Sequence, residues 1–546
     1  MITARAAGDA ALLLETELPE ALAYPSGKGT GPAELAAAIR AAALPGVIDV
    51  VPGARTVLVS FKPGSWPAAE LVGRLRRLPR HPGPDQGGPA DVAEIDVVYD
   101  GPDLADVAAL TGLTASQVIA RHQAALYRVG WLGFSPGFGY LTGLDPALAA
   151  VPRLASPRVT VPAGAVAIAG GLAAVYPAAS PGGWRIIGRT AAALWDPYRD
   201  PPALLTPGTR VRFRAVDELP GSSAEQLGSP AGEPGGLAGP GRDGRPGQRF
   251  VEVLQPGPLT TVQDLGRPGF AHLGVPHAGA ADAGSLSLAN RLVGNQERIA
   301  GLEVTLGRLA LRFEHAATAA LTGAPAPIRL TTADGVSGQP GHARAFTIPA
   351  GSVLRLGTPS AGLRSYLAIG GGIDVPSVLG SRSADCLSGL GPGPLRAGHR
   401  LPVGRPRSRQ EIRREGWPRG AEPALPGPAD EVELRVIAGP RDDWFAPEAI
   451  DTLAAGGYAV SVASNRTGLR LTGPVLRRRR GRSGELLSEG LAAGSLQVTH
   501  DGQPILMLAD HPTTGGYPVI AVVLSADLGL AAQLRPGQRV RFIVST

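Results

Sequence analysis

The chain has 546 residues and a hydrophobic content of 44%, which exceeds what one core can organise and corresponds to about three or four domains. It contains no apolar run long enough for a membrane span, and its single cysteine, Cys386, excludes an internal disulfide and a zinc site built from several cysteines. Arginine supplies nearly all of the net charge of +6, because Lys28 and Lys62 are the only lysines. The densest basic run, at 477–483, has no aromatic residue to stack bases, which favours a solvated loop over nucleic-acid binding.

The N-terminal part of the chain alternates strand and helix patterns. Its first residues are typical of a strand and not of a signal peptide, so we expect a cytoplasmic protein. A helical stretch at 31–44 precedes two short strands at 47–61, and a second helical stretch follows at 67–78. This order predicts a small α+β layer over residues 1–82. Residues 83–217 then combine a pair of helices with short strands broken by Gly and Pro, a pattern typical of a barrel or sandwich.

The second part of the chain begins after a segment rich in Gly and Pro at 218–249. Few apolar side chains remain in that segment, so we predict a linker. Two β-rich blocks follow, at 250–404 and 431–546, and an Arg- and Pro-rich insert at 405–430 separates them. The last block ends in "LRPGQRVRFIV", which echoes "LTPGTRVRFRAV" at 205–216 and indicates related architecture in the two parts.

Several common catalytic motifs are absent from the sequence. Lys28 is followed by Gly29 and Lys62 by Pro63, so neither lysine can belong to a phosphate-binding P-loop. The nine histidines include no HExxH pair, and no GxSxG elbow occurs. Neither lysine has the surroundings of a biotin attachment site, so we expect no biotin on this chain.

Polar residues recur instead in Gly- and Pro-rich turns. Arginine forks and glycine amides in such turns suit carboxylate and phosphate recognition. The turns are "SPGGWRIIGRT" at 180–190, "TTVQDLGRPGF" at 260–270, "SNRTGLRL" at 464–471 and "ADHPTTGGYP" at 509–518.

The stretch "GFSPGFGYL" at 133–141 sets three aromatic rings among glycines and a proline. The rings either wall a pocket or plug the end of a barrel, and composition alone favours the plug.

Together these phrases resemble two known families. Residues 1–217 resemble allophanate hydrolase subunit 1, also known as a sporulation-kinase inhibitor, through "YDGPDLADVAALTG", "GFSPGFGYL", "PRVTVPAGAVAIAGG" and "YPAASPGGWRIIGRT". Residues 250–546 resemble the partner family, allophanate hydrolase subunit 2 or inhibitor antagonist, through "TTVQDLGRPGFAHLGVPHAGAAD", "LANRLVGN", "RSYLAIGGGIDVPSVLGSRS", "SNRTGLRL" and "ADHPTTGGYPVIAVV". The pair is similar to the B and C subunits of bacterial ATP-dependent 5-oxoprolinase and, more distantly, to the carboxyltransferase part of urea carboxylase. The linker then joins a B-like and a C-like part into one fusion.

The resemblance implies a mainly β fold with an α+β part: a ferredoxin-like N-terminal domain followed by cyclophilin-like β-barrels. It also favours Phe134, Phe138 and Tyr140 as the wall of a pocket, in contrast to composition alone. The chain departs from the family pattern at Leu172–Ala174, where a Gln-Thr-Gly phrase is usual, and this leaves the exact substrate open.

The implied activity is the ATP-dependent opening of 5-oxo-L-proline to L-glutamate through a phosphorylated lactam. The implied cofactors are ATP and Mg²⁺, and the implied partner is a separate A subunit. Arginines would clamp anions, carboxylates would hold Mg²⁺ or move protons, and His122 is either a base or, as we favour, a core histidine. The catalytic candidates are Asp264, Asp282, Glu489, Asp510 and His122, and the candidates for substrate or phosphate binding are Phe134, Phe138, Tyr140, Arg158, Gly182, Gly183, Trp184, Arg189, Arg267, Asn290, Arg466, Arg470, Thr513, Thr514 and Tyr517.

The metal ligands, the half that binds ATP and any homo-oligomer stay open at this point. Two other functions also stay open. One is a carboxyltransferase module that receives carboxybiotin from a partner, and the other is a regulatory protein that binds a histidine kinase.

Overall fold

The computed structural model describes most of the chain in six segments. These are residues 2–16, 31–78, 92–219, 248–406, 424–482 and 486–545. Most of the predicted linker and of the predicted insert therefore lies outside the described residues. Below, residues 2–219 are called the first half and residues 248–545 the second half. The described residues include no helix long and apolar enough to span a membrane.

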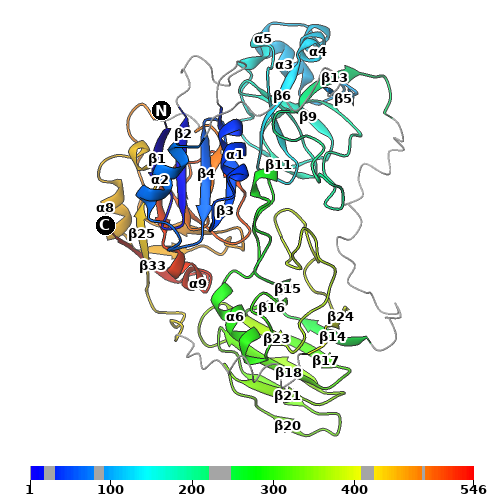
Figure 1. Ribbon diagram of the computed structural model, residues 1–546, viewed down its shortest axis with the longest axis vertical. Helices are drawn as coiled ribbons and strands as arrows, with labels where there is room; N and C mark the ends of the chain where they lie inside the picture. Colours follow the sequence, from blue (N-terminus) through cyan, green and yellow to red (C-terminus); the bar gives the residue numbers. More distant parts are fainter. Residues whose placement is uncertain are drawn as a thin grey trace.

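The first half begins with a four-stranded antiparallel sheet covered by two helices, drawn in blue in Figure 1. Its strand order is β1-β2-β4-β3, which is the ferredoxin-like order with the last strand moved to the N-terminus. The elements are β1 (Ile2–Ala6), β2 (Ala11–Thr16), α1 (Pro32–Ala41), β3 (Val47–Pro52), β4 (Thr56–Phe61) and α2 (Ala68–Arg76). The predicted helices and strands of this layer are thus confirmed.

Both faces of this first sheet are buried, which explains why β2 reads "ALLLET" without polar alternation. Leu12 and Leu14 face the helices and pack in the same core as Ile39 of α1. Leu13 and Leu58 face the opposite way and pack against Ala271 and Ala492 of the second half. The sheet is therefore a layer between its own helices and the second half.

A seven-stranded sheet in the order β12-β9-β10-β7-β6-β13-β5 forms the rest of the first half. A bridge between Val98, next to β5, and Arg189 of β12 joins its two edges, so the sheet curls into a barrel. A capping box between Thr114 and Gln117 starts the second of its covering helices. The elements are β5 (Val92–Val97), α3 (Leu104–Thr111), α4 (Ala115–Ala124), β6 (Tyr127–Leu132), β7 (Gly139–Thr142), α5 (Pro146–Ala149), β9 (Ala165–Ala169), β10 (Leu172–Val175), β12 (Arg185–Arg189) and β13 (Arg210–Ala215), with a separate ribbon of β8 (Arg158–Val161) and β11 (Ser180–Gly182).

The second half opens with two packed sheets, drawn in green at the bottom of Figure 1. One sheet contains β14 (Arg249–Pro256), β17 (Leu309–Phe313), β19 (Ile328–Thr331), β20 (Ser337–Gly338), β22 (Val353–Leu356) and β24 (Arg400–Val403). The other contains β15 (Leu259–Gln263), β16 (Gly301–Thr305), β18 (Ala317–Gly323), β21 (Ala345–Ile348) and β23 (Arg364–Ile369), and α6 (Ala283–Leu292) packs on β18 and β23. A shared apolar core lies between the two sheets.

A closed barrel completes the second half, in the order β25-β32-β29-β30-β27-β26-β33. Its elements are β25 (Val432–Ala438), η2 (Asp442–Trp444), α8 (Ala449–Ala455), β26 (Tyr458–Val460), β27 (Gly468–Thr472), β29 (Ser495–Val498), β30 (Pro504–Met507), β32 (Val519–Val523), η3 (Ser525–Asp527), α9 (Leu528–Ala531) and β33 (Arg539–Val544), with a short ribbon of β28 (Glu489–Gly490) and β31 (Thr514–Gly515). Its first and last strands, β25 and β33, pair in parallel, as do β5 and β13 in the first barrel. The two echoed phrases of the sequence therefore form equivalent closing strands.

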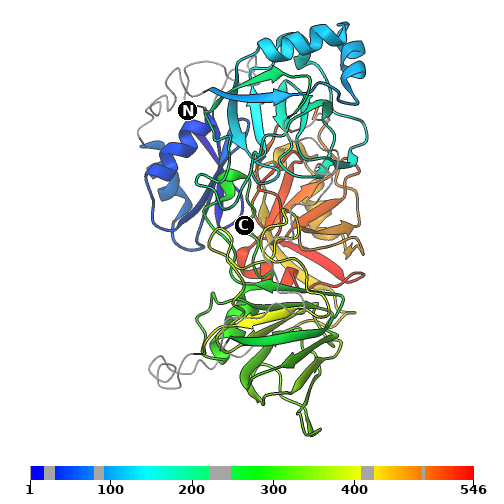
Figure 2. The same ribbon diagram turned by 90° about the vertical axis from the view of Figure 1, so that its right-hand side faces the viewer.

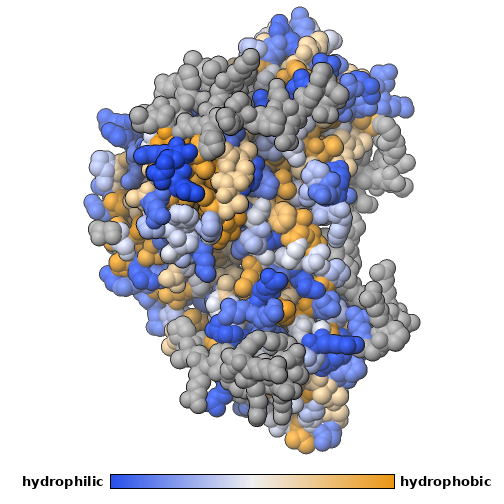
Figure 3. All heavy atoms as spheres, in the orientation of Figure 1, coloured by the Kyte–Doolittle hydropathy of each residue, from blue (hydrophilic) through white to orange (hydrophobic). Residues whose placement is uncertain are grey.

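The two halves are packed against each other over several elements, as Figure 2 shows for the first sheet and the second barrel. The backbone N–H of Ala54 donates to the carbonyl of Ser488 at 2.8 Å. The short helix η1 (Ala271–Leu273) of the second half lies between β3 and β6 of the first half. On the face drawn in Figure 3, hydrophilic and hydrophobic residues are interspersed. The prediction of a mainly β chain with an α+β layer and barrels is confirmed.

Candidate functional site

Charged side chains from four loops and two strands converge inside the second half. Asp264 follows β15, Asp385 lies between β23 and β24, Arg466 precedes β27 and Asp510 follows β30. We call this set the charged cluster, and its members are Asp264, Arg267, Glu303, Arg364, Asp385, Arg466 and Asp510. Each of these residues is at least nine-tenths buried.

Asp264 fixes the loop that carries Asp385. Its carboxylate accepts hydrogen bonds from the hydroxyls of Ser381 and Ser383 at 2.6 and 2.5 Å. It also accepts the backbone N–H groups of Arg382 at 2.7 Å and Gly266 at 2.8 Å. With these four bonds Asp264 organises a loop, and its oxygens are already engaged by the protein.

Arg466 is held by other members of the cluster. Its guanidinium donates to Asp510 at 2.8 and 2.9 Å, to the carbonyl of Gly279 at 2.6 Å, and in a short contact to Glu303. Burial by itself raises the pKa of Glu303, but Arg466 and Arg364 together hold it below its usual value. Arg466 therefore ties the two packed sheets to the second barrel.

Arg267 differs from Arg466 because part of its fork is unpartnered among the described residues. One terminal nitrogen, Nη2, donates to the carbonyl of Ser383 at 2.5 Å, while Nε and Nη1 are buried and have no hydrogen-bond partner there. Burial lowers the pKa of Arg267, and the fields of Asp385, Asp264 and Asp510 oppose that effect. Buried donors without partners are costly, so a group that accepts their hydrogen bonds is favoured at this position.

Three titratable groups with shifted pKa values lie around Arg267, and the sequence analysis did not select them. Burial and the neighbouring Asp510 raise the pKa of Asp385. Burial, His511 and Arg267 lower the pKa of His277 to about 4, and burial lowers that of His511. His511 Nδ1 lies 2.8 Å from the carbonyl of Pro512, which only accepts, so Nδ1 carries the proton and Nε2 keeps its lone pair. His277 sits in the phrase "TTVQDLGRPGFAHLGVPHAGAAD", which carried the resemblance, and Asp385 follows the phrase that ends in "GSRS" by two residues.

The aromatic loop, residues 133–141, lies over the outside of the first barrel in a layer of rings. The ring centroid of Phe138 lies 5.2 Å from Phe134, 5.0 Å from Tyr140 and 5.8 Å from Trp184. Phe138, Tyr140 and Trp184 are buried, and Phe134 at the edge is half-buried. The three rings of the loop thus pack on the outside of the barrel, Phe134 is the least buried of them, and their role as the wall of a pocket stays a prediction.

Thr513 and Thr514 connect the charged cluster to the aromatic layer. Thr514 accepts a hydrogen bond from the backbone N–H of Phe134 at 3.0 Å. Thr513 is buried and its hydroxyl has no hydrogen-bond partner among the described residues. The loop 510–514 therefore spans the boundary between the halves, with Asp510 at one end and Thr514 at the other.

Other candidates in the first half occupy separate positions. His122 is fully buried in the barrel core, where it stacks on Phe213 at 4.6 Å and bonds to Tyr99 at 2.8 Å, and burial lowers its pKa to about 3. Arg158 donates to the buried Asp103 at 2.7 Å. Arg189 pairs with Asp100 at 2.8 Å and is partly exposed. Gly182 lies against the hydroxyl of Tyr176, and Gly183 follows it in the chain.

Other candidates in the second half support local structure. Asp282 caps α6 through Ser285 at 3.0 Å, and Asn290 closes the turn after α6 by donating to the carbonyl of Ile299 at 2.7 Å. Arg470 is exposed on β27.

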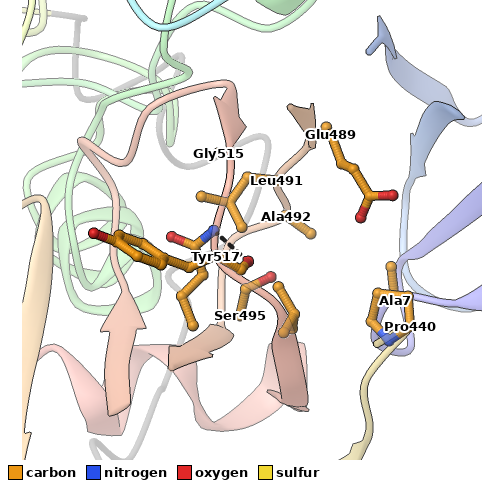
Figure 4. Close-up of a pocket in the computed structure, with 11 residues that line it drawn as sticks. Ala7, Pro440, Glu489, Leu491, Ala492, Ser495, Gly515 and Tyr517 are labelled. Atoms are coloured by element: carbon orange, nitrogen blue, oxygen red, sulfur yellow. Dashed lines mark hydrogen bonds between the residues drawn. The ribbon is translucent and has the colours of Figure 1, made fainter. Parts of the chain in front are cut away.

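Glu489 pairs with Arg441, and Tyr517 stacks edge-on against His500 at 5.5 Å. Glu489 and Tyr517 line the hollow drawn in Figure 4, which lies between Ala7 of the first sheet and the second barrel.

The residues of the site do not fit a protein-held Mg²⁺ ion. Mg²⁺ needs free carboxylate oxygens in octahedral geometry, whereas Asp264, Asp282, Glu489 and Asp510 each accept hydrogen bonds from protein groups. Within the described ranges, no three His, Cys, Asp or Glu side chains are grouped so that they could hold a metal.

Comparison with known proteins separates the two halves in the same way. Residues 2–205 match the family model "Carboxyltransferase domain, subdomain C and D", and residues 273–544 match "Carboxyltransferase domain, subdomain A and B". Over 297 residues the chain is 40% identical to the C subunit of 5-oxoprolinase from Escherichia coli (strain K12), a match that covers 54% of this chain and 91% of that protein. Over 209 residues it is 41% identical to the B subunit of 5-oxoprolinase from Escherichia coli O157:H7, a match that covers 38% of this chain and 92% of that protein.

The chain belongs to the families of the 5-oxoprolinase B and C subunits. Its first half corresponds to the B subunit and its second half to the C subunit, as expected for a fusion. The second half is also 34% identical over 308 residues to urea amidolyase of Saccharomyces cerevisiae, of which it covers 16%. The crystal structure of TTHA0988 superposes with a TM-score of 0.81 at 35% identity and covers 100% of both chains.

Proposed function

We propose that this chain is a component of an ATP-dependent 5-oxoprolinase that opens 5-oxo-L-proline to L-glutamate through a phosphorylated lactam, together with a separate A subunit. The relatives named as B and C subunits of 5-oxoprolinase support the proposal. The observation that carries it is the buried guanidinium of Arg267, whose Nε and Nη1 have no partner among the described residues. We also propose that the chain works in the cytoplasm.

The chemistry of the substrate suits the groups around Arg267. 5-Oxoproline is a lactam with a carboxylate, and a guanidinium fork binds a carboxylate or a phosphorylated oxygen through paired N–H groups. Asp385 can donate a proton to the departing ring nitrogen, because burial and Asp510 raise the pKa of its carboxyl group. His511 offers Nε2 as an acceptor in the same region. In this assignment Arg267 binds an anion, while Asp385 and His511 handle protons.

Resonance stabilises the lactam, so ATP would supply the driving force by phosphorylating its oxygen. The carboxylates of the site are engaged by protein groups, and we therefore assign no step to Mg²⁺ on this chain. In this proposal water attacks the phosphorylated carbon, the ring C–N bond breaks as the nitrogen takes a proton, and phosphate leaves, while the residues of this chain bind and orient the lactam.

The test is glutamate formation from 5-oxoproline with ATP and Mg²⁺, using this chain with and without an A subunit known to be competent. Product only in the presence of both supports the proposal, and no product refutes it. Arg267→Gln and Arg267→Lys should each lower kcat/KM at least tenfold, about 1.4 kcal/mol of transition-state stabilisation, because lysine keeps the charge but not the fork. Arg312→Gln, which breaks an exposed pair with Glu252, is the matched control.

A second candidate is a carboxyltransferase that transfers a carboxyl group from the carboxybiotin of a partner to an amide. The two carboxyltransferase family matches and the likeness to urea amidolyase favour it. Incubation with carboxybiotin and urea distinguishes the two functions. Carboxylated urea without ATP-dependent glutamate formation would replace the first proposal with the second.

A further inference from the structure

The aromatic loop contacts the second half through its backbone as well as its rings. The N–H of Phe134 donates to Thr514 Oγ1 at 3.0 Å, and the N–H of Gly137 donates to the carbonyl of Leu273 at 3.0 Å. Gly274 lies so close to the loop that a Cβ there would be 2.4 Å from the carbonyl oxygen of Ser135. The loop thus contacts the other half at Phe134, Ser135 and Gly137.

The backbone of the loop is specialised for this contact. A Cβ on Gly133 would lie 2.2 Å from Thr514 Oγ1, so only glycine allows this approach. Phe134 has a φ of 65°, a conformation that costs a bulky residue free energy and persists only where surrounding contacts hold it. The hydrogen bond to Thr514 and the packing of the Phe134 ring on Phe138 are the contacts that hold it.

Thr514 connects the aromatic loop to the loop 510–514. Its hydroxyl accepts the backbone N–H of Phe134 at the start of the aromatic loop. On the other side, the carbonyl of Thr513 accepts the N–H of Leu491 at 2.9 Å, and Asp510 accepts the N–H of Cys386 at 3.2 Å. A shift at Thr514 would therefore reach Asp510, which lies four residues away, pairs with Arg466 and acts on Arg267 through its field.

We propose that Thr514 is a positioning residue: through it, the aromatic loop of the first half sets the position of the loop 510–514 in the second half. The sequence "GFSPGFGYL" is then a joint between the halves. Its glycines allow the backbones of the two halves to approach, and its rings hold the loop in the conformation that makes the contact. The consequence for activity rests on the proposed function, but the joint itself does not.

Hydrogen exchange on the intact chain tests the joint without any activity. Thr514→Val removes the hydroxyl and should speed exchange of the Phe134 amide about tenfold, whereas Thr514→Ser keeps the hydroxyl and should restore slow exchange. If Thr514 positions the loop, the amides of Leu491 and Cys386 should exchange faster as well. Thr142→Val is the matched control, because Thr142 is a buried threonine that bonds to Arg128 within the first half at 3.1 Å.

Each outcome decides the proposal. An unchanged Phe134 amide in Thr514→Val would overturn it. Faster exchange confined to Phe134, with Leu491 and Cys386 unchanged, would reduce Thr514 to a local contact and would also overturn it. If Thr514→Val fails to fold, Gly133→Ala pushes on the same hydroxyl from the first half, and the same amides are then compared.

A kinetic measurement adds the functional consequence. With the A subunit, Thr514→Val should lower kcat about a hundredfold with a smaller change in KM, because misplacement by about 1 Å has that effect on a catalytic arrangement. Thr514→Ser should recover most of the rate. If the natural chain itself forms no glutamate, the proposed function fails, while the exchange experiment still decides the joint. A Thr514→Val enzyme with natural kcat would contradict the positioning role.

Discussion

Glu303 is a buried carboxylate that pairs with two arginines of the charged cluster, Arg364 and Arg466. Replacing it by glutamine isolates the effect of its charge. The side chain is 1% exposed. It is in short contact with Arg466, lies 3.4 Å from Arg364, and accepts hydrogen bonds from the hydroxyl of Tyr366 and the backbone of Ala281, both at 2.9 Å. Glutamine keeps the size and one acceptor, so Glu303→Gln removes little besides the charge between two buried arginines.

The magnitude follows from the partners that remain. Removing one member of a buried ion pair costs about 3–5 kcal/mol, because the other charge stays buried and uncompensated. Arg466 keeps Asp510 as a partner, so we expect the lower end, about 3 kcal/mol. For a domain of about 150–250 residues this corresponds to a fall of about 6–12 °C in the melting temperature.

Differential scanning calorimetry of the intact chain measures this effect as a shift of the transition that includes the second half. The control is Glu252→Gln, which breaks an exposed pair with Arg312 at 2.8 Å and should lower stability by at most about 1 kcal/mol. The pKa of Glu303 is held below its usual value, so its contribution is present above the unfolded pKa of about 4.3 and is lost as the pH falls below it. Equal shifts for the two variants at pH 7 would refute the argument.

Three further predictions concern single buried groups. Burial lowers the pKa of His122 from 6.5 to about 3, so below pH 6.5 the unfolded chain takes up a proton that the folded barrel does not. His122→Gln should therefore make the melting temperature of the first half fall less steeply between pH 7 and 5 than in the natural chain. Equal slopes would contradict this. Asp49 accepts the N–H of Ala271 at 3.1 Å, and burial raises its pKa to about 6. Asp49→Asn should therefore stabilise the contact between the halves above pH 6 and make no difference below pH 4, which thermal melts across this pH range measure. Tyr366→Phe removes the hydroxyl that accepts the N–H of Asp282 and donates to Glu303, and should cost about 1–3 kcal/mol in the same calorimetric assay; a change under 0.5 kcal/mol, roughly the scatter of surface substitutions, would mean that the bond contributes nothing.

The elements of the fold could largely be predicted from the sequence because they depend on local patterns. The helical stretches at 31–44 and 67–78 bury residues at helical spacing, and the structure has helices there. Turn glycines and short apolar runs predicted barrels, and the shared closing phrase predicted two equivalent strands. The two packed sheets of the second half lie in the β-rich block predicted at 250–404, but their arrangement as two sheets was not foreseen, because short strands in a barrel and in a sandwich have the same pattern.

The roles of the charged residues were decided only by tertiary structure. Arg267 and Arg466 look alike in the sequence, yet packing gives Arg466 a full set of partners and leaves part of the Arg267 fork without one among the described residues. Asp385 becomes a proton-donor candidate because folding buries it and brings Asp510, from the loop after a strand of the second barrel, near it, and both effects raise its pKa.

The aromatic loop shows the same division. Its glycines and rings were evident from the sequence, but its contact with Thr514, 380 residues further along the chain, was not. Local conformation depends on neighbouring residues in the sequence. Burial, the ionisation of charged groups and the partners of polar groups depend on segments that meet only when the chain has folded.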